Sequence, residues 1–165
     1  MPILDDRNFE FFSHSPEQTR RLGIQLGKLL SQGDVICLEG NLGAGKTTLI
    51  QGLARGWGAL DQVSSPTYVI VNEYGRPDGQ TLFHVDAYRL DNTLEAEFLD
   101  FDRMLSQGSM VIEWAERIKA VLPEEFLWIS LAYTAPEHRE MLLTPTGPRY
   151  ERMVEHTRRR IYGAY

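Results

Sequence analysis

The chain has 165 residues, of which 42% are hydrophobic and 24% are charged, and its formal net charge is −6 at pH 7. This is ordinary globular composition, and the length predicts one domain over residues 1–165. The negative net charge argues against binding of a nucleic-acid backbone by the whole surface. The sequence shows no signal peptide and no apolar run long enough to span a bilayer, so we expect a cytoplasmic protein that does not bind membranes.

The start of the chain predicts a short strand followed by a helix. Weak alternation around Phe9 and Phe11 favours the strand. Ser15 can cap the helix, and Gln18, three residues later, completes a capping box. Gly33 suits the end of this helix. The apolar face of the helix consists of leucines at helical spacing, namely Leu22, Leu26, Leu29 and Leu30.

Residues 35–48 predict a buried strand, a glycine-rich turn and the start of a helix. Within them, Gly40, Gly45, Lys46 and Thr47 fit G-x-x-x-x-G-K-[ST], the phosphate-binding loop. The glycines let backbone N–H groups point at phosphate oxygens, and the helix adds its positive dipole end. The lysine supplies a charge for the β- and γ-phosphates, and the threonine hydroxyl can ligate Mg²⁺. The predicted nucleotide-binding residues are Asn41, Leu42, Gly43, Ala44, Gly45, Lys46, Thr47 and Thr48.

The middle of the chain predicts a helix and then a hairpin. The helix runs from about residue 46 to 57. A polar turn over residues 63–68 leads into a strand over residues 68–74. A loop over residues 75–79 then returns the chain through a strand over residues 81–86. Because hairpin strands pair antiparallel, this part of the sheet is expected to be antiparallel.

The rest of the chain predicts short helices and strands and ends in a charged helical tail at about residues 150–165. The expected elements are helical pieces over residues 91–104, a strand over 109–114, a helix over 115–121, closing strands over 126–132 and 139–143, and a charged helix over 150–160.

Two acids are candidates for the acidic residue that a phosphate-binding loop requires at the end of a neighbouring strand. Asp86 ends one apolar strand and Glu113 ends another, and either could hold Mg²⁺ or orient the attacking water. Alternatively, each acid simply marks the point where a strand leaves the core. Glu39 also ends a strand, but it precedes the loop and is expected to be structural.

Other residues carry weaker signals. Residues 65–67 suit a switch loop or an ordinary turn, and His84 suits either a satisfied core histidine or a catalytic one. Arg89 could neutralise transition-state charge or pair with a nearby glutamate. Trp114 could stack on a ligand or pack in the core. The basic cluster at residues 158–160 is expected to be a solvated helix face, with RNA contact as the alternative.

In their order along the chain, these motifs resemble those of the bacterial tRNA threonylcarbamoyladenosine biosynthesis ATPases, the TsaE (YjeE) family. The resemblance extends over roughly residues 13–120. Tyr68 stands where the family commonly has phenylalanine, and Ala87 where it commonly has leucine. The motifs that carry the resemblance are residues 42–48, 65–68, 84–90 and 112–114.

The resemblance implies an α/β protein with a three-layer P-loop NTPase-like fold and a mostly parallel central sheet, to which the hairpin adds antiparallel strands. It implies an ATPase that converts ATP to ADP and phosphate with Mg²⁺, weakly when alone. The expected partner is a TsaB–TsaD-type heterodimer that threonylcarbamoylates adenosine 37 of tRNA. The ATPase would contact tRNA only indirectly, through that complex.

The resemblance also implies roles for particular residues. Lys46, with the loop amides, would hold phosphates and assist catalysis, and Asp86 would act nearest to hydrolysis by positioning water or Mg²⁺. Thr47 and Glu113 would hold the metal. The residues implied at the adenine, nucleotide or partner side are Thr19, Trp114 and Glu116.

Two rival functions remain open from the sequence. A small-molecule P-loop kinase would use the same loop, although no acceptor pocket can be placed from the sequence. A nucleotide-gated adaptor would bind ATP and a partner with little hydrolysis. A GTPase is disfavoured because the chain has no Asn-Lys-x-Asp or Thr-Lys-x-Asp segment to read guanine.

Overall fold

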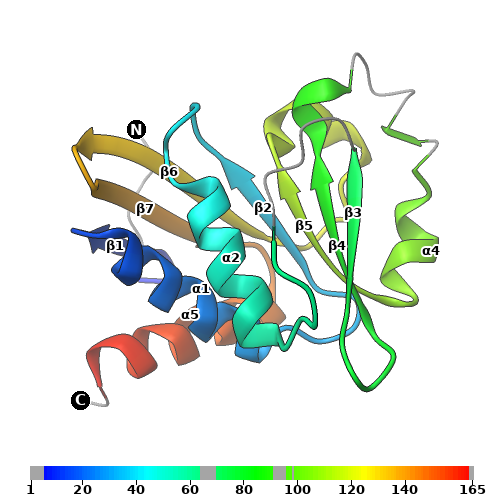
Figure 1. The fold of residues 1–165 in the computed structure, drawn as a ribbon, viewed down its shortest axis with the longest axis horizontal. Helices are drawn as coiled ribbons and strands as arrows, with labels where there is room; N and C mark the ends of the chain where they lie inside the picture. The colour runs from blue at the N-terminus through cyan, green and yellow to red at the C-terminus, as the bar shows by residue number, and fades with distance from the viewer. Residues whose placement is uncertain (1–5, 64–69, 91–95, 98, 164–165) are drawn as a thin grey trace.

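The structure is a computed structural model, and it describes residues 6–63, 70–90, 96, 97 and 99–163 (Figure 1). Within these residues the chain forms a seven-stranded sheet in the order β1-β7-β6-β2-β5-β4-β3. The strands are β1 (Phe9–Ser13), β2 (Val35–Glu39), β3 (Val71–Gly75), β4 (Thr81–Asp86), β5 (Gly108–Glu113), β6 (Leu127–Ala135) and β7 (His138–Pro145).

The centre of the sheet is parallel and its edges are antiparallel. β2 pairs in parallel with β6 and β5, and β5 pairs in parallel with β4. On one edge β3 pairs antiparallel with β4, and on the other β7 pairs antiparallel with β6 and β1. Residues 35–38 of β2 are all apolar and buried, as a parallel strand covered on both faces requires. The predicted α/β class, with a parallel centre and antiparallel additions, is confirmed.

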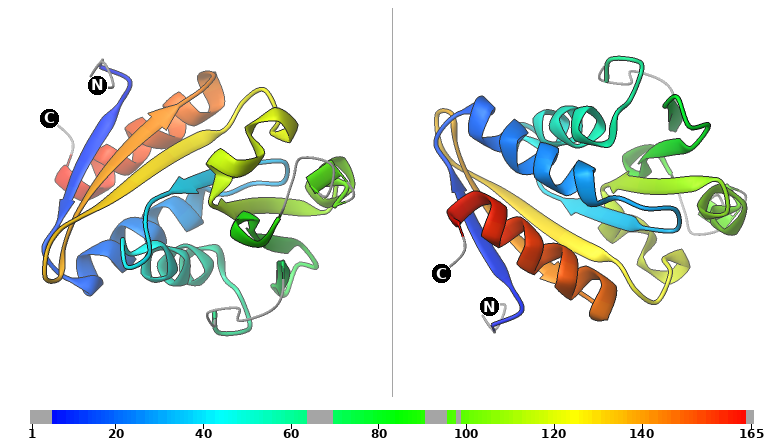
Figure 2. Two further views of the ribbon diagram at one scale, coloured as in Figure 1. Left: turned by 90° about the horizontal axis from the view of Figure 1, so that it is seen from above. Right: turned by 90° about the horizontal axis from the view of Figure 1, so that it is seen from below.

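Helices flank the sheet on both faces, which gives three layers (Figure 2). One hydrophobic core lies between the sheet and α1 (Pro16–Leu29), α2 (Lys46–Trp57) and α5 (Pro148–Tyr162). A second core lies under α4 (Phe101–Leu105) and the 3₁₀ helices η1 (Ala87–Arg89) and η2 (Ala115–Val121). In the described residues, no helix is long and apolar enough to cross a membrane.

Glycines allow α1 and α2 to pack very closely. A Cβ atom on Gly23 or Gly27 of α1 would collide with backbone oxygens of α2. Gly52 and Gly56 of α2 face backbone oxygens of α1 in the same way. Since no larger residue fits without moving a helix, this contact fixes the position of α2 and of the loop that precedes it.

The predicted cap by Ser15 at the start of α1 is confirmed, but Gln18 accepts from His14, the residue before the cap, and not from Ser15 as a capping box requires. Ser15 Oγ accepts a hydrogen bond from the Gln18 backbone N–H at 3.2 Å, and the His14 N–H donates to Gln18 Oε1 at 2.7 Å. The predicted role of Gly33 is wrong, because α1 already ends at Leu29. Gly33, with φ of 91°, instead makes the turn that leads into β2.

Four further predictions differ from the structure or lie wholly or partly outside the described residues. The regular helix predicted over residues 115–121 is wrong, because these residues form a 3₁₀ helix that is kinked at Ile118. β5 ends at Glu113, one residue before the predicted end. Of the helical pieces expected over residues 91–104, the described part contains α4, whereas residues 91–95 and the motif at residues 65–68 lie outside the described residues.

The predicted charged helix at the end of the chain is α5, and it packs beside α1 (Figure 2). The Tyr150 hydroxyl accepts a hydrogen bond from the Val35 N–H at 2.9 Å, and Arg149 pairs with Asp34 at 2.7 Å. Burial raises the pKa of Tyr150 to about 12, so the phenol stays neutral. These contacts attach α5 to the start of β2, the strand that leads into the phosphate-binding loop.

Candidate nucleotide-binding site

The phosphate-binding motif lies between β2 and α2, in the strand–loop–helix context that it requires. Gly43 and Gly45 have φ of 80° and 101°, which is the left-handed conformation that favours glycine. Gly45 caps α2 and places no side chain on the amides of the first turn. These amides therefore remain for an anion at the positive end of the helix dipole.

Lys46 is the buried cation of the loop, with only 6% of the residue exposed. Its Nζ donates hydrogen bonds to the carbonyl oxygens of Gly40 and of Asn41, the latter at 3.1 Å, and lies 4.3 Å from the ring centroid of Trp114. Burial lowers the pKa of this lysine, while Glu113 and two further acids oppose the shift. The neighbouring carboxylates thus favour the charged form that binds phosphate.

Strand register brings the two candidate acids together. Asp86 and Glu113 are directly opposite each other in the parallel ladder of β4 and β5, so both side chains lie on the same face of the sheet. Asp86 is half-buried, and its Oδ1 accepts a hydrogen bond from the Tyr88 N–H at 3.1 Å. Glu113 is buried, and its Oε2 lies 2.7 Å from His84 Nε2. Both carboxylates are therefore held by protein groups.

The two acids line a cleft of about 490 Å³, called the smaller cleft, together with loop residues that include Lys46 and Thr47. The threonine hydroxyl and the two carboxylates are hard oxygen ligands of the kind that Mg²⁺ prefers. Within the described parts of the chain, no cluster of three or more His, Cys, Asp or Glu side chains could hold a metal. The donors fit an ion that takes its other ligands from nucleotide phosphates and water.

A sequence model of the family described as threonylcarbamoyl adenosine biosynthesis protein TsaE matches residues 13–141. The chain belongs to the TsaE family. It is 40% identical over 143 residues to TsaE of Bacillus subtilis, covering 86% of this chain and 88% of that protein. It is 44% identical over 137 residues to TsaE of Streptomyces coelicolor, covering 79% of this chain and 93% of that protein.

The similarity extends to a solved structure. The crystal structure of Bacillus subtilis YdiB matches with a TM-score of 0.77 and 32% sequence identity, over 93% of this chain and 96% of that chain. A P-loop fold in a member of the TsaE family implies that the chain binds a nucleotide.

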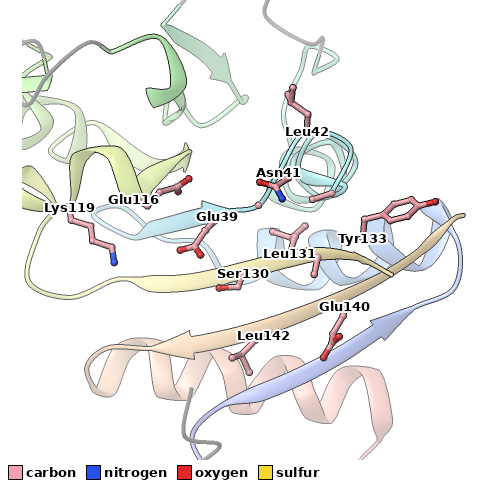
Figure 3. Close-up of a pocket in the computed structure, with 13 residues that line it drawn as sticks. Glu39, Asn41, Leu42, Glu116, Lys119, Ser130, Leu131, Tyr133, Glu140 and Leu142 are labelled. Atoms are coloured by element: carbon pink, nitrogen blue, oxygen red, sulfur yellow. The ribbon is translucent and has the colours of Figure 1, made fainter. Parts of the chain in front are cut away.

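A second, larger cleft of about 1050 Å³ lies on the other side of the loop, over β6 and β7 (Figure 3). It shares Leu42 and Ala44 with the smaller cleft. Its charged lining comes from side chains outside the phosphate-binding motif, namely Glu39, Glu116, Lys119 and Glu140.

The structure separates the three residues that the TsaE resemblance places at the nucleotide or partner side. Trp114 lines the smaller cleft and has a left-handed backbone, with φ of 57°. Glu116 lines the larger cleft instead. Thr19 is buried, with its Oγ1 2.7 Å from Ser13 Oγ, and lines neither cleft. Its position near adenine stays a prediction.

Arg139 and Tyr88 also line the smaller cleft, and sequence reasoning assigned neither of them a role there. The aliphatic part of Arg139 passes over Gly45, while its guanidinium carbon lies 4.8 Å from the ring centroid of Tyr133. The Nε of this arginine is buried and has no hydrogen-bond partner among the residues that the structure describes. Arg139 lies outside the four motifs that carry the TsaE resemblance, so only the three-dimensional arrangement reveals it.

Proposed function

We propose that this protein is the ATP-hydrolysing member of the system that makes threonylcarbamoyladenosine in tRNA, acting with a TsaB–TsaD-type heterodimer. Its relatives are named for this biosynthesis, which supports a role for this chain in the same modification. One observation carries the hydrolytic part of the proposal. The register of β4 and β5 sets Asp86 beside Glu113, in the cleft that also contains Lys46 and Thr47.

ATP binding begins with the phosphates. Lys46 Nζ exchanges the carbonyl oxygens of Gly40 and Asn41 for β- and γ-phosphate oxygens, while the first amides of α2 bind the phosphate chain. The geometry of the loop is set before the nucleotide arrives, because Gly43 and Gly45 already hold the required backbone conformation. Binding energy is then not consumed in ordering the loop.

Hydrolysis uses the two acids in different ways. Thr47 and Glu113 would hold Mg²⁺, which neutralises charge on the phosphates during transfer. Asp86 keeps Oδ1 on the Tyr88 amide and leaves Oδ2 for the attacking water. It orients that water toward the γ-phosphorus and accepts its proton, so that ATP and water give ADP and phosphate.

The arginines of the C-terminal cluster at residues 158–160 are partly paired, which argues against direct binding of tRNA by this cluster. Contact with tRNA is then expected only through the partner complex. Arg158 and Arg159 both pair with Glu155, at 2.6 and 3.2 Å. Arg158 also donates to the backbone oxygen of Asn8 at 2.8 Å. These pairs reduce the positive field that an RNA backbone would require.

The test is phosphate release from ATP, measured with and without a TsaB–TsaD-type heterodimer. We expect the dimer to stimulate release by the wild type and to give no stimulation with Asp86→Ala. Nucleotide consumption that requires an added hydroxyl substrate would indicate a kinase instead. Tight ATP and dimer binding without turnover, even in the complete complex, would indicate a nucleotide-gated adaptor.

A further inference from the structure

Three buried side chains form a hydrogen-bonded chain from the edge strand β3 to the acid assigned to the metal. The Tyr74 hydroxyl lies 3.2 Å from His84 Nδ1, and His84 Nε2 lies 2.7 Å from Glu113 Oε2. The residues come from three adjacent strands, β3, β4 and β5. The side chains of His84 and Glu113 are 1% and 10% exposed, so water competes little for these hydrogen bonds.

Packing alone does not require a histidine at this position. Strand alternation puts His84 on the same sheet face as Leu82 and Asp86, and the register sets Asp86 beside Glu113. Leu82 is fully buried two residues earlier and needs no side-chain hydrogen bond. A polar side chain in such a place must be fully partnered to avoid a large desolvation penalty, and His84 has a partner at each ring nitrogen.

The direction of the donors follows from the ionisation that a metal ligand requires. An ionised Glu113 only accepts, so His84 donates through Nε2–H, and its Nδ1 accepts from the Tyr74 hydroxyl. Glu113 thereby sets the neutral tautomer of His84, Tyr74 holds the ring at Nδ1, and the two rings stack with centroids 6.1 Å apart. The terminal torsion of a glutamate is otherwise broad. The hydrogen bond at Oε2 therefore sets the orientation of the carboxylate and leaves Oε1 to bind an ion.

We propose that His84 is a positioning residue for the Mg²⁺ of the bound nucleotide: it holds Glu113 in the orientation that binds the ion, and Tyr74 holds His84. This inference rests on the proposed function, because it needs Glu113 as a ligand. Groups that hydrogen-bond to metal ligands are typically worth about 10–100-fold in metal affinity. A histidine that only packs would contribute to stability and leave the Mg²⁺ dependence of nucleotide binding unchanged.

The test is calorimetric titration of the protein with ADP, once with Mg²⁺ and once with EDTA. For His84→Leu, the gain in ADP affinity that Mg²⁺ provides should fall by about 10–100-fold, while the affinity in EDTA stays within about twofold. His84→Gln places an amide N–H near the position of Nε2 and should retain most of the gain. Tyr74→Phe removes the hydrogen bond at His84 Nδ1 but keeps the one to Glu113, so it should lose less of the Mg²⁺-dependent gain in ADP affinity than His84→Leu does.

Two further variants separate positioning from packing. His84→Leu combined with Tyr74→Phe also removes the Tyr74 hydroxyl that His84→Leu alone leaves unpartnered, so the melting temperature should fall less than in His84→Leu, although Glu113 still loses its hydrogen bond. Reduced Mg²⁺ dependence with the ADP affinity in EDTA retained supports positioning, whereas equal losses of ADP affinity in Mg²⁺ and in EDTA overturn it. In a Glu113→Gln background, His84→Leu should have no further effect on Mg²⁺ dependence.

The same titrations distinguish failure of this inference from failure of the proposed function. If the wild type gains no ADP affinity from Mg²⁺, the metal role of Glu113 is wrong and both proposals fall. If the wild type gains affinity and His84→Leu keeps that gain, only the positioning role is overturned.

Discussion

Both clefts beside the phosphate-binding loop are lined by lysine and acidic side chains. They differ in the hydrogen bonds that these charged side chains make to other protein groups. The larger cleft has about twice the volume, at about 1050 Å³ against about 490 Å³. In the smaller cleft, Lys46, Asp86 and Glu113 each hydrogen-bond to another protein group. In the larger cleft, Glu116 Oε2 is buried without a partner among the described residues. Hydrogen bonds to the candidate lysine and acids, rather than volume, therefore distinguish the smaller cleft, although the buried Nε of Arg139 in that cleft also has no partner among the described residues.

Sheet topology explains the difference. The smaller cleft lies at the carboxyl ends of the parallel strands β2, β4 and β5, where ligands commonly bind in open α/β sheets. The larger cleft extends over the antiparallel strands β6 and β7. There Ser130, Leu142 and Glu140 point to a face that strand alternation leaves away from the core of α1 and α2 (Figure 3).

Asp86→Ala should have the largest effect of the variants considered, and this effect should be confined to the rate of ATP hydrolysis. Loss of a residue that positions water and accepts its proton typically costs about 10²–10⁴-fold in rate. The affinity for ATP should stay within about twofold, because Asp86 lies outside the loop that binds the phosphates. The measurement is partner-stimulated phosphate release together with ATP titration. Glu39→Ala, which removes the carboxylate that ends β2 in the larger cleft, is the matched control.

An Asp86→Ala variant that loses ATP binding as severely as Lys46→Ala would contradict this assignment. Equal rate losses in Asp86→Ala and Glu39→Ala would remove the distinction between the two clefts.

Lys46→Ala should weaken nucleotide affinity strongly. A charged hydrogen bond is worth about 1.5–3 kcal/mol, which corresponds to roughly 10–100-fold in the dissociation constant of ADP. Calorimetric titration measures this, with Lys119→Ala as the control, because Lys119 is a lysine of the larger cleft whose Nζ lies 5.0 Å from the ring centroid of Trp128. A similar loss in both variants would mean that nucleotide occupies both clefts.

The sequence alone is sufficient to predict those features that depend on a few neighbouring residues. The spacing from Gly40 to Thr47 predicts the loop because the required turn, helix start and charge lie within a few residues. Asp86 and Glu113 become candidates from the sequence because each ends an apolar strand, and the structure confirms that they end β4 and β5. The mostly parallel centre of the sheet, by contrast, is implied by the resemblance to the TsaE family, whereas the antiparallel pairing of β3 with β4 follows from the hairpin pattern itself.

Sequence is insufficient where the fold brings distant residues together or separates near ones. The sequence singles out His84, but no local pattern reveals that it hydrogen-bonds to Glu113 on the neighbouring strand. Trp114 and Glu116 are two positions apart, yet the left-handed backbone of Trp114 turns the chain and places them in different clefts. Arg139 reaches Gly45 because β7 pairs with β6, which is the neighbour of β2, the strand that leads into the loop.

Arg139→Ala should have a moderate effect on the smaller cleft. Its buried Nε beside the loop suits an additional hydrogen bond to nucleotide, and a net hydrogen bond of about 0.5–1.5 kcal/mol predicts a loss of about 2–10-fold in ADP affinity. Arg139→Lys keeps the charge and loses the planar donor group, so it should recover only part of the affinity. Unchanged affinity in Arg139→Ala would leave this arginine a role in packing over Gly45.

Glu116→Gln should have the smallest effect on isolated nucleotide binding, at less than about twofold, because a carboxylate of the larger cleft interacts with Lys46 only through space. Glu116 raises the pKa of Lys46 less than Glu113 does, so removing its charge leaves the stronger neighbour in place. The buried, unpartnered Oε2 becomes part of a neutral amide, which lowers the desolvation penalty. A loss well beyond twofold in ADP titration would show that the nucleotide reaches past Leu42 into the larger cleft, and the two clefts would then be halves of one site.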